Sequence, residues 1–123
     1  MLIFKGTVQS GVRDFERRMT KFPEVFRRAT DEELFPGTIN VMVGEKVRVR
    51  EDFRILGVDI GEPDQDLLFE KCLINEIAAY RVRPFSLIDG GGGHGDHVLE
   101  IACSTKIPDL HPGTVVEVTL YRD

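Results

Sequence analysis

The chain has 123 residues, 41% of them hydrophobic and 30% charged, a composition and length that predict one globular domain over residues 1–123. Its net charge of −5 argues against a nucleic-acid partner, because binding to DNA or RNA requires a basic face. No apolar run approaches the roughly 20 residues of a membrane-spanning helix, and the opening MLIFKGTVQS is too short and polar for a signal peptide, so we expect a cytoplasmic protein without a membrane partner.

The first predicted elements are a strand and an interrupted helix. In LIFKGTV apolar and polar residues alternate, which predicts a half-buried strand. Within Arg13–Ala29 apolar residues recur at helical spacing, and we expect this stripe in the core: Phe15, Met19, Phe22, Phe26 and Ala29. Pro23 interrupts the stripe, so we expect two short helices, the second opening near Thr20 with Thr20 as its N-cap. Six Lys and Arg residues fall within Arg13–Arg28, a basic patch that suits either a small anion or a solvated helix face.

Beyond the helices the sequence shows mostly strand patterns. TINVMV and KVRVR, separated by Gly44-Glu45, predict a hairpin with Val47 and Val49 facing inward. Further predicted strands are RILGVDI, LLFEKCLI, IAAYRVRPF, HVLEIAC and the end of DLHPGTVVEVTLY. Some seven short strands with one helical insertion after the first predict a mainly β fold, a small closed β-barrel. We expect Cys72 and Cys103 to be reduced thiols in its core.

The stretch LFPGTINV places two polar side chains on one face of a predicted strand. Ile39, Val41 and Val43 would face the core, so Thr38 and Asn40 point together to the other side, with Cα atoms roughly 6–7 Å apart. Two such oxygens could bind one small hard cation or a phosphate oxygen, and Mg²⁺ needs only one or two protein ligands beside a triphosphate. On this spacing alone a structural role is the favoured interpretation, since Thr suits strands and Asn bonds backbone near turns.

The segment GGGGHGDHVLE contains two other candidate features. Gly90–Gly93 predicts a flexible surface loop that could close over a ligand, and His94, Asp96 and His97 are candidate ligands of a transition metal. In the strand that follows, Glu100 faces away from Leu99 and Ile101. A carboxylate among small or apolar neighbours could serve as a general base, although many strand glutamates simply face solvent.

Several segments, in order, are similar to one protein family. The first strand ends in Ser10-Gly11, the helical FPEVFRRA precedes a turn, and PGTINVMV contains a G-T-x-N strand; GEKVRVREDF, YRVRPF and VLEIACSTKIPDLHPGTVVEV follow. Together these segments resemble the archaeal CTP-dependent riboflavin kinases, a family of cradle-loop β-barrels. The resemblance covers most of the chain, and G-T-x-N is its specific motif. It implies a closed cradle-loop-type β-barrel of about six to seven strands with a helical insertion after the first strand.

The resemblance also implies a reaction, the Mg²⁺-dependent transfer of a phosphoryl group from CTP to riboflavin, giving FMN and CDP. Thr38 and Asn40 would bind the magnesium carried by the nucleotide, and Glu100 would be the base for the flavin 5′-hydroxyl. The residues implied in nucleotide binding are Ser10, Gly11, Arg13 and Gly37, with Arg13 standing where the family has a glycine-rich loop. Arg17 or Lys21 could also lie near the phosphates. The partners would be a small-molecule nucleotide and a flavin.

Two other functions remain open at the level of the sequence. The chain could be a non-catalytic barrel of the same fold that binds a nucleotide or a flavin, because its first loop differs from the family's and the segment between Pro84 and Glu100 is shorter. It could instead be a metal-dependent hydrolase that uses His94, Asp96 and His97.

Overall fold

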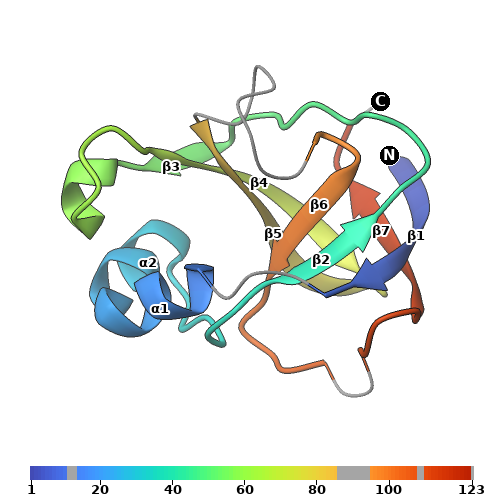
Figure 1. The fold of residues 1–123 in the computed structure, drawn as a ribbon, viewed down its shortest axis with the longest axis horizontal. Coiled ribbons are helices and arrows are strands. Elements are labelled where there is room, and N and C mark those ends of the chain that lie inside the picture. Colours follow the sequence, from blue (N-terminus) through green and yellow to red (C-terminus); the bar gives the residue numbers. More distant parts are fainter. Residues whose placement is uncertain (11–13, 86–94, 108–109, 123) are drawn as a thin grey trace.

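A closed sheet of antiparallel strands organises the chain (Figure 1). The computed structural model describes residues 1–10, 14–85, 95–107 and 110–122. In these residues the strands are β1 (Leu2–Gln9), β2 (Ile39–Met42), β3 (Phe53–Ile55), β4 (Leu67–Ile74), β5 (Ile77–Pro84), β6 (Val98–Ala102) and β7 (Val115–Leu120). The helices α1 (Asp14–Lys21) and α2 (Pro23–Thr30) follow β1, and the 3-10 helix η1 (Gly57–Ile60) follows β3. The predicted mainly β class, with a helical insertion after the first strand, is confirmed.

Six of the strands close into a barrel. The strand order is β3-β4-β5-β6-β2-β1-β7, and β4 also pairs with β7, so β3 is an extra strand beside β4. Every pairing is antiparallel. Closure pairs backbone N–H and C=O groups of β4 with those of β7, which would otherwise lie at the edge of the sheet. The predicted small closed barrel of six to seven strands is therefore confirmed.

Side chains alternate between the inside and the outside of the barrel. The interior is packed with aliphatic residues and both cysteines, among them Val41, Leu99, Ile101, Cys72 and Cys103. Both cysteines are free and buried, as expected for core thiols. Phe4 and Ile39 pack against this cluster, which confirms the alternation predicted for the first strand and for TINVMV.

The two helices cover part of the outer face of the barrel, on one side in Figure 1. Phe15, Met19 and Phe26 are buried there with Phe69 of β4 and Val82 of β5, and Phe22 and Ala29 are packed against them. The predicted helical stripe is thus a core stripe. Phe26 meets Phe69 edge-on, with ring centroids 6.3 Å apart, and aromatic pairs add about 0.5–1.5 kcal/mol beyond the burial of their surface.

The helix boundary at Pro23 differs from the prediction in its cap. Two helices do form, but α2 has Phe22 as its N-cap residue and Pro23 in its first turn, where a missing N–H costs nothing. Thr20 lies inside α1, and its hydroxyl donates to the carbonyl of Glu16, one turn back. The prediction that Thr20 caps the second helix is wrong, because Thr20 bonds within its own helix.

The predicted hairpin after β2 is also wrong. β2 pairs with β1 and β6, and residues 46–50 are not a strand. Val47 is buried in the barrel, but its N–H donates to the carbonyl of Asp96, 3.0 Å away. The strand predicted in RILGVDI is shortened to β3 because the chain turns into η1.

A buried ionic cluster fills the part of the barrel interior next to Val47. Glu70 of β4 is fully buried and accepts hydrogen bonds from Nε and Nη2 of Arg122, at 2.7 and 2.6 Å, and from the backbone N–H of Arg50. Arg81 of β5, also fully buried, lies 3.9 Å from Glu70 and donates to the carbonyl of Val47. Burial lowers the pKa of Arg81 to about 10, so the guanidinium is still charged at neutral pH.

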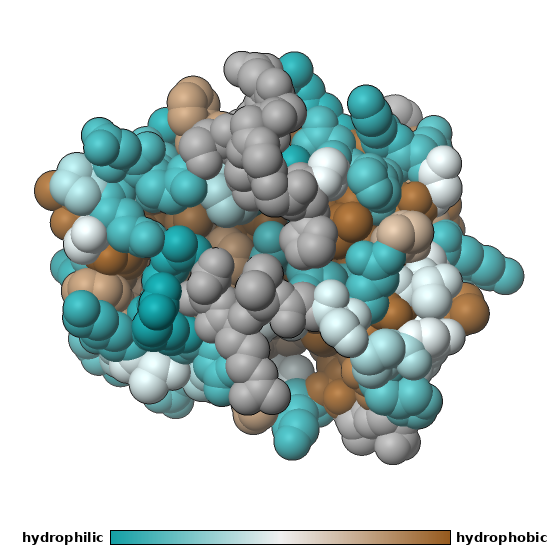
Figure 2. Space-filling view, in the orientation of Figure 1, coloured by the Kyte–Doolittle hydropathy of each residue, from teal (hydrophilic) through white to brown (hydrophobic). Residues whose placement is uncertain are grey.

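The face of the molecule that Figure 2 shows is mostly hydrophilic. In Figure 2 hydrophobic residues occur as small separate groups among hydrophilic ones. Across the described ranges, no helix is long and apolar enough to cross a membrane.

Candidate functional site

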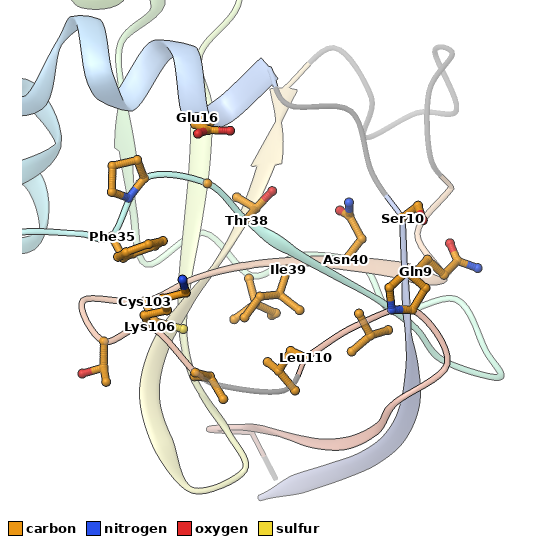
Figure 3. Close-up of a pocket in the computed structure, with 17 residues that line it drawn as sticks. Gln9, Ser10, Glu16, Phe35, Thr38, Ile39, Asn40, Cys103, Lys106 and Leu110 are labelled. Atoms are coloured by element: carbon orange, nitrogen blue, oxygen red, sulfur yellow. The ribbon is translucent and has the colours of Figure 1, made fainter.

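A cavity of about 510 Å³ lies where β1, β2 and β6 come together (Figure 3). Its walls are the end of β1, α1, residues 35–40, the end of β6, and the segment that leads to β7. The volume falls within the ~300–1,000 Å³ of typical small-molecule sites. The cavity has a polar side and an apolar side, and β2 contributes to both.

The polar side begins at the turn before β2. Gly37 lines the cavity with φ at +113°, a left-handed conformation that favours glycine, and its N–H faces the sulfur of Met19 at 3.4 Å. Thr38 and Asn40 follow and also line the cavity. Figure 3 shows their side chains on the same side of the strand, below Glu16 of α1. Gly37, Thr38 and Asn40, which the sequence singled out, therefore all line the cavity.

Glu100 joins this group from the neighbouring strand β6. It is paired in register with Asn40, and the hydroxyl of Thr38 donates to its Oε2, 3.3 Å away. Only 9% of Glu100 is exposed. Glu100 is not one of the residues that line the cavity, but it adjoins two of them, Asn40 by strand pairing and Thr38 by the hydrogen bond.

The oxygen atoms of this group suit a hard divalent cation. The Thr38 hydroxyl uses its single proton on Glu100, which leaves its lone pairs for another partner. Oδ1 of Asn40 is buried, and within the described part of the chain it accepts no hydrogen bond, an arrangement that costs free energy unless a ligand compensates. Hydroxyl, amide and carboxylate oxygens are the ligands that Mg²⁺ takes in proteins. Thr38 and Asn40, with Glu100 beside them, fit a magnesium site.

The apolar side of the cavity is the mouth of the barrel. Ile39 points opposite to its neighbours Thr38 and Asn40 and toward Leu110 (Figure 3). The other apolar wall residues are Val8, Ile101, Cys103 and Ile107. Burial raises the pKa of Cys103 to about 11, so this thiol stays protonated at neutral pH and serves as an apolar surface. This side can accept the ring system of a ligand, and the opposite, polar side can accept the ligand's charged groups.

The remaining residues predicted to bind nucleotide are placed unevenly. Ser10 is exposed and lines the cavity, whereas Gly11 and Arg13 lie outside the described residues. Arg17 and Lys21 are exposed on α1, and neither lines the cavity. The cations that the sequence offered for the phosphates are therefore not those that the described structure places at the site.

The second candidate metal site is only partly described. His94 and the loop Gly90–Gly93 fall outside the described residues, and Asp96 pairs with the buried Arg83 at 3.2 Å. Among the residues that the structure does describe, no three His, Cys, Asp or Glu side chains group around a possible ion.

Glu16, Phe35 and Lys106 are among the cavity residues that the sequence reasoning did not single out. Glu16 belongs to the polar face of α1, and the helical pattern identifies only the buried face. Phe35 and Lys106 lie on segments without regular structure, where no periodicity indicates direction. One signal was available: a large aromatic residue next to the Pro-Gly turn that begins the motif.

The protein is a closed antiparallel barrel, and a cavity of small-molecule size lies at the mouth of the barrel. Comparisons of the sequence with models of known protein families and with curated proteins find no match. The resemblance to riboflavin kinases stays a prediction from the motif residues and the order of the sequence segments.

Proposed function

We propose that this protein is a magnesium-dependent phosphotransferase of the riboflavin kinase type, which transfers a phosphoryl group from a nucleoside triphosphate to riboflavin. The donor suggested by the family resemblance is CTP. One observation carries the proposal: Thr38, Asn40 and Glu100 meet beside a cavity large enough for small molecules, with the Asn40 oxygen buried and unpartnered in the described chain.

Each residue has a distinct role in this reaction. Thr38 and Asn40 would hold a magnesium ion through Oγ1 and Oδ1, and its charge would offset that of the phosphates. Glu100 accepts the proton of the flavin 5′-hydroxyl as that oxygen bonds to the terminal phosphorus and the bond to the nucleoside diphosphate breaks. The hydrogen bond from Thr38 orients the Glu100 carboxylate for this task.

The two-sided cavity supports an acceptor with an apolar ring and a polar tail. Ile39, Ile101 and Leu110 offer a surface for a flavin ring, and β2 presents Thr38 and Asn40 from its other face. A hydroxyl at the end of the tail would then approach the polar side, where Glu100 contacts Thr38.

A non-catalytic barrel that binds a nucleotide or flavin is the second candidate. The hydrogen bond from Thr38 to Oε2 of Glu100 favours this candidate. A carboxylate in such a contact can stabilise the site structurally, without deprotonating a substrate. The two functions share the magnesium and phosphate site and differ only in turnover.

The experiment compares binding with turnover in wild type, Glu100→Gln and a control, Glu117→Gln. Glu117 lies on β7 and does not line the cavity. Thermal shifts with CTP, ATP, GTP, riboflavin and FMN, each with and without Mg²⁺, report binding, which stabilises by about 2.7 kcal/mol at a hundredfold excess over Kd. Formation of FMN reports turnover.

For a kinase, Glu100→Gln keeps nucleotide binding and lowers turnover about 10²–10⁴-fold, the usual contribution of a general base. Glu117→Gln changes neither. Wild-type protein that binds these ligands but forms no FMN would be a binding barrel. No response to any ligand with Mg²⁺ would contradict both functions.

A further inference from the structure

The described residues of the cavity wall offer little positive charge to an anionic ligand. Glu16 lines the cavity, and Glu100 accepts the hydrogen bond from Thr38. Of the described residues that line the cavity, Lys106 is the one with a positive charge. Among these described residues, Lys106 is therefore the side-chain cation that a polyphosphate would meet.

Lys106 has no ionic partner among the described residues. It is exposed on the segment after β6, and its Nζ lies over the ring of Phe35, 5.6 Å from the centroid. In the described chain no carboxylate lies within salt-bridge distance of its ammonium group. A cation–π contact at an exposed site is weak, so a phosphate can readily compete for the ammonium.

Phe35 connects Lys106 to the magnesium motif. Its ring is 45% exposed at the cavity wall, and its backbone N–H donates to the carbonyl of Cys103, at 2.8 Å. This hydrogen bond ties the segment that enters Thr38 and Asn40 to the segment that carries Lys106. Lys106, Thr38 and Asn40 therefore line one cavity, on two segments that a backbone hydrogen bond connects.

We propose that Lys106 is the phosphate-binding residue of this cavity and that Phe35 positions it. The inference deepens the proposed function, because the ligand it predicts is a magnesium-bound polyphosphate. Thr38 and Asn40 bind the metal, and Lys106 contacts phosphate oxygens that the metal leaves uncompensated. A hydrogen bond that involves a charged group stabilises more than a neutral one, so the loss of this ammonium should weaken binding measurably.

The test measures Kd by calorimetry for two probes, inorganic triphosphate and CTP, each with excess Mg²⁺ at 50 and 200 mM NaCl. The variants are Lys106→Gln, Lys106→Arg and Phe35→Leu. The matched control is Lys46→Gln, which removes an exposed lysine in the turn after β2, away from the cavity.

Lys106→Gln should weaken binding of both probes about ten- to a hundredfold and reduce its dependence on salt. Lys106→Arg should restore binding to within about threefold, and Lys46→Gln should match wild type. Phe35→Leu, which keeps an apolar side chain but removes the ring, should give a smaller loss. A residue with a purely structural role would not change the salt dependence.

The outcomes separate this inference from the proposed function. If Lys106→Gln binds inorganic triphosphate as wild type does, or if wild type binds neither probe, the role of Lys106 is refuted. If wild type binds inorganic triphosphate through Lys106 but neither CTP nor another nucleotide, the inference holds and the kinase is refuted. If CTP binding depends on Lys106 but FMN is never formed, the inference again holds and the function is that of a binding barrel.

Discussion

Replacing Asn40 with leucine separates the stability of the fold from the chemistry of the site. Asn40 is 4% exposed, and in the described chain its Oδ1 accepts no hydrogen bond. A buried polar atom without a partner costs about 1–3 kcal/mol. Leucine removes this atom, and the adjoining cavity gives its additional volume room. In EDTA we therefore expect Asn40→Leu to unfold at a higher temperature than wild type.

The expected gain is about 1 kcal/mol, the lower end of that range, because leucine loses some contacts of the amide. For a chain of this length it corresponds to a rise of roughly 3–6 °C in Tm. With Mg²⁺ and CTP the order reverses: wild type gains stability from the bound ligand, and Asn40→Leu does not. The assay is thermal unfolding followed by circular dichroism in EDTA, in Mg²⁺, and in Mg²⁺ with CTP.

Asn75→Leu is the control variant, for which we expect the opposite change in Tm. Its Oδ1 accepts the backbone N–H of Glu117 at 2.9 Å, and its φ is +46°, so Asn75→Leu should lower Tm in every buffer. If Asn40→Leu also lowers Tm in EDTA, the Asn40 oxygen stabilises the fold and is not held for a ligand. If the variant keeps the full response to Mg²⁺ with CTP, Asn40 is not a metal ligand.

Three further predictions concern the rest of the barrel. Glu70→Gln should lower the free energy of unfolding by about 3–5 kcal/mol in urea denaturation, because it removes the carboxylate that faces the buried Arg81 and the partly buried Arg122; a loss below about 1 kcal/mol would contradict this account. Gly57→Ala should cost about 3 kcal/mol or more, since its Cβ would lie 1.9 Å from the Glu62 carbonyl oxygen, whereas Gly44→Ala, with nothing within 4 Å, should stay within about 0.5 kcal/mol. Iodoacetamide at pH 8 should modify Cys103 slowly, because burial raises the pKa of this thiol to about 11. It should modify Cys72 more slowly still, because the pKa of Cys72 is raised to about 12 and, of the two cysteines, only Cys103 borders the cavity. Mass spectrometry that finds Cys72 modified first would contradict this placement.

The alternation of β2 is the part of the site that sequence could predict. A strand has a side-chain period of two, so the burial of Val41 and Val43 requires Thr38 and Asn40 to lie on the other face. Glu100 follows from the same rule applied to β6. That these strands are neighbours was not derivable from pattern, because the β2–β6 pairing joins residues about sixty positions apart.

The false hairpin shows where local pattern fails. KVRVR alternates as a strand should, yet Val47 is inward because its N–H bonds Asp96 and because Arg81 donates to its carbonyl. Both partners come from distant parts of the chain. Lys106 escaped prediction for a related reason: its place at the cavity depends on the contact between Phe35 and Cys103.

The two ends of β6 explain why the ligand site lies where it does. Before β6, Asp96 pairs with Arg83, and the adjoining barrel interior is filled by Arg81 and Glu70. After β6, Cys103 borders the cavity, and the interior there is apolar and open. Burial of an ion pair costs several kcal/mol per ion in desolvation, so the charged end is a poor place for a further ligand. The apolar end can accept a ring at little cost, and the outward face of β2 supplies polar groups beside it. The proposed reaction, in which a magnesium-bound triphosphate meets an acceptor with an apolar ring, would need both kinds of surface next to one another.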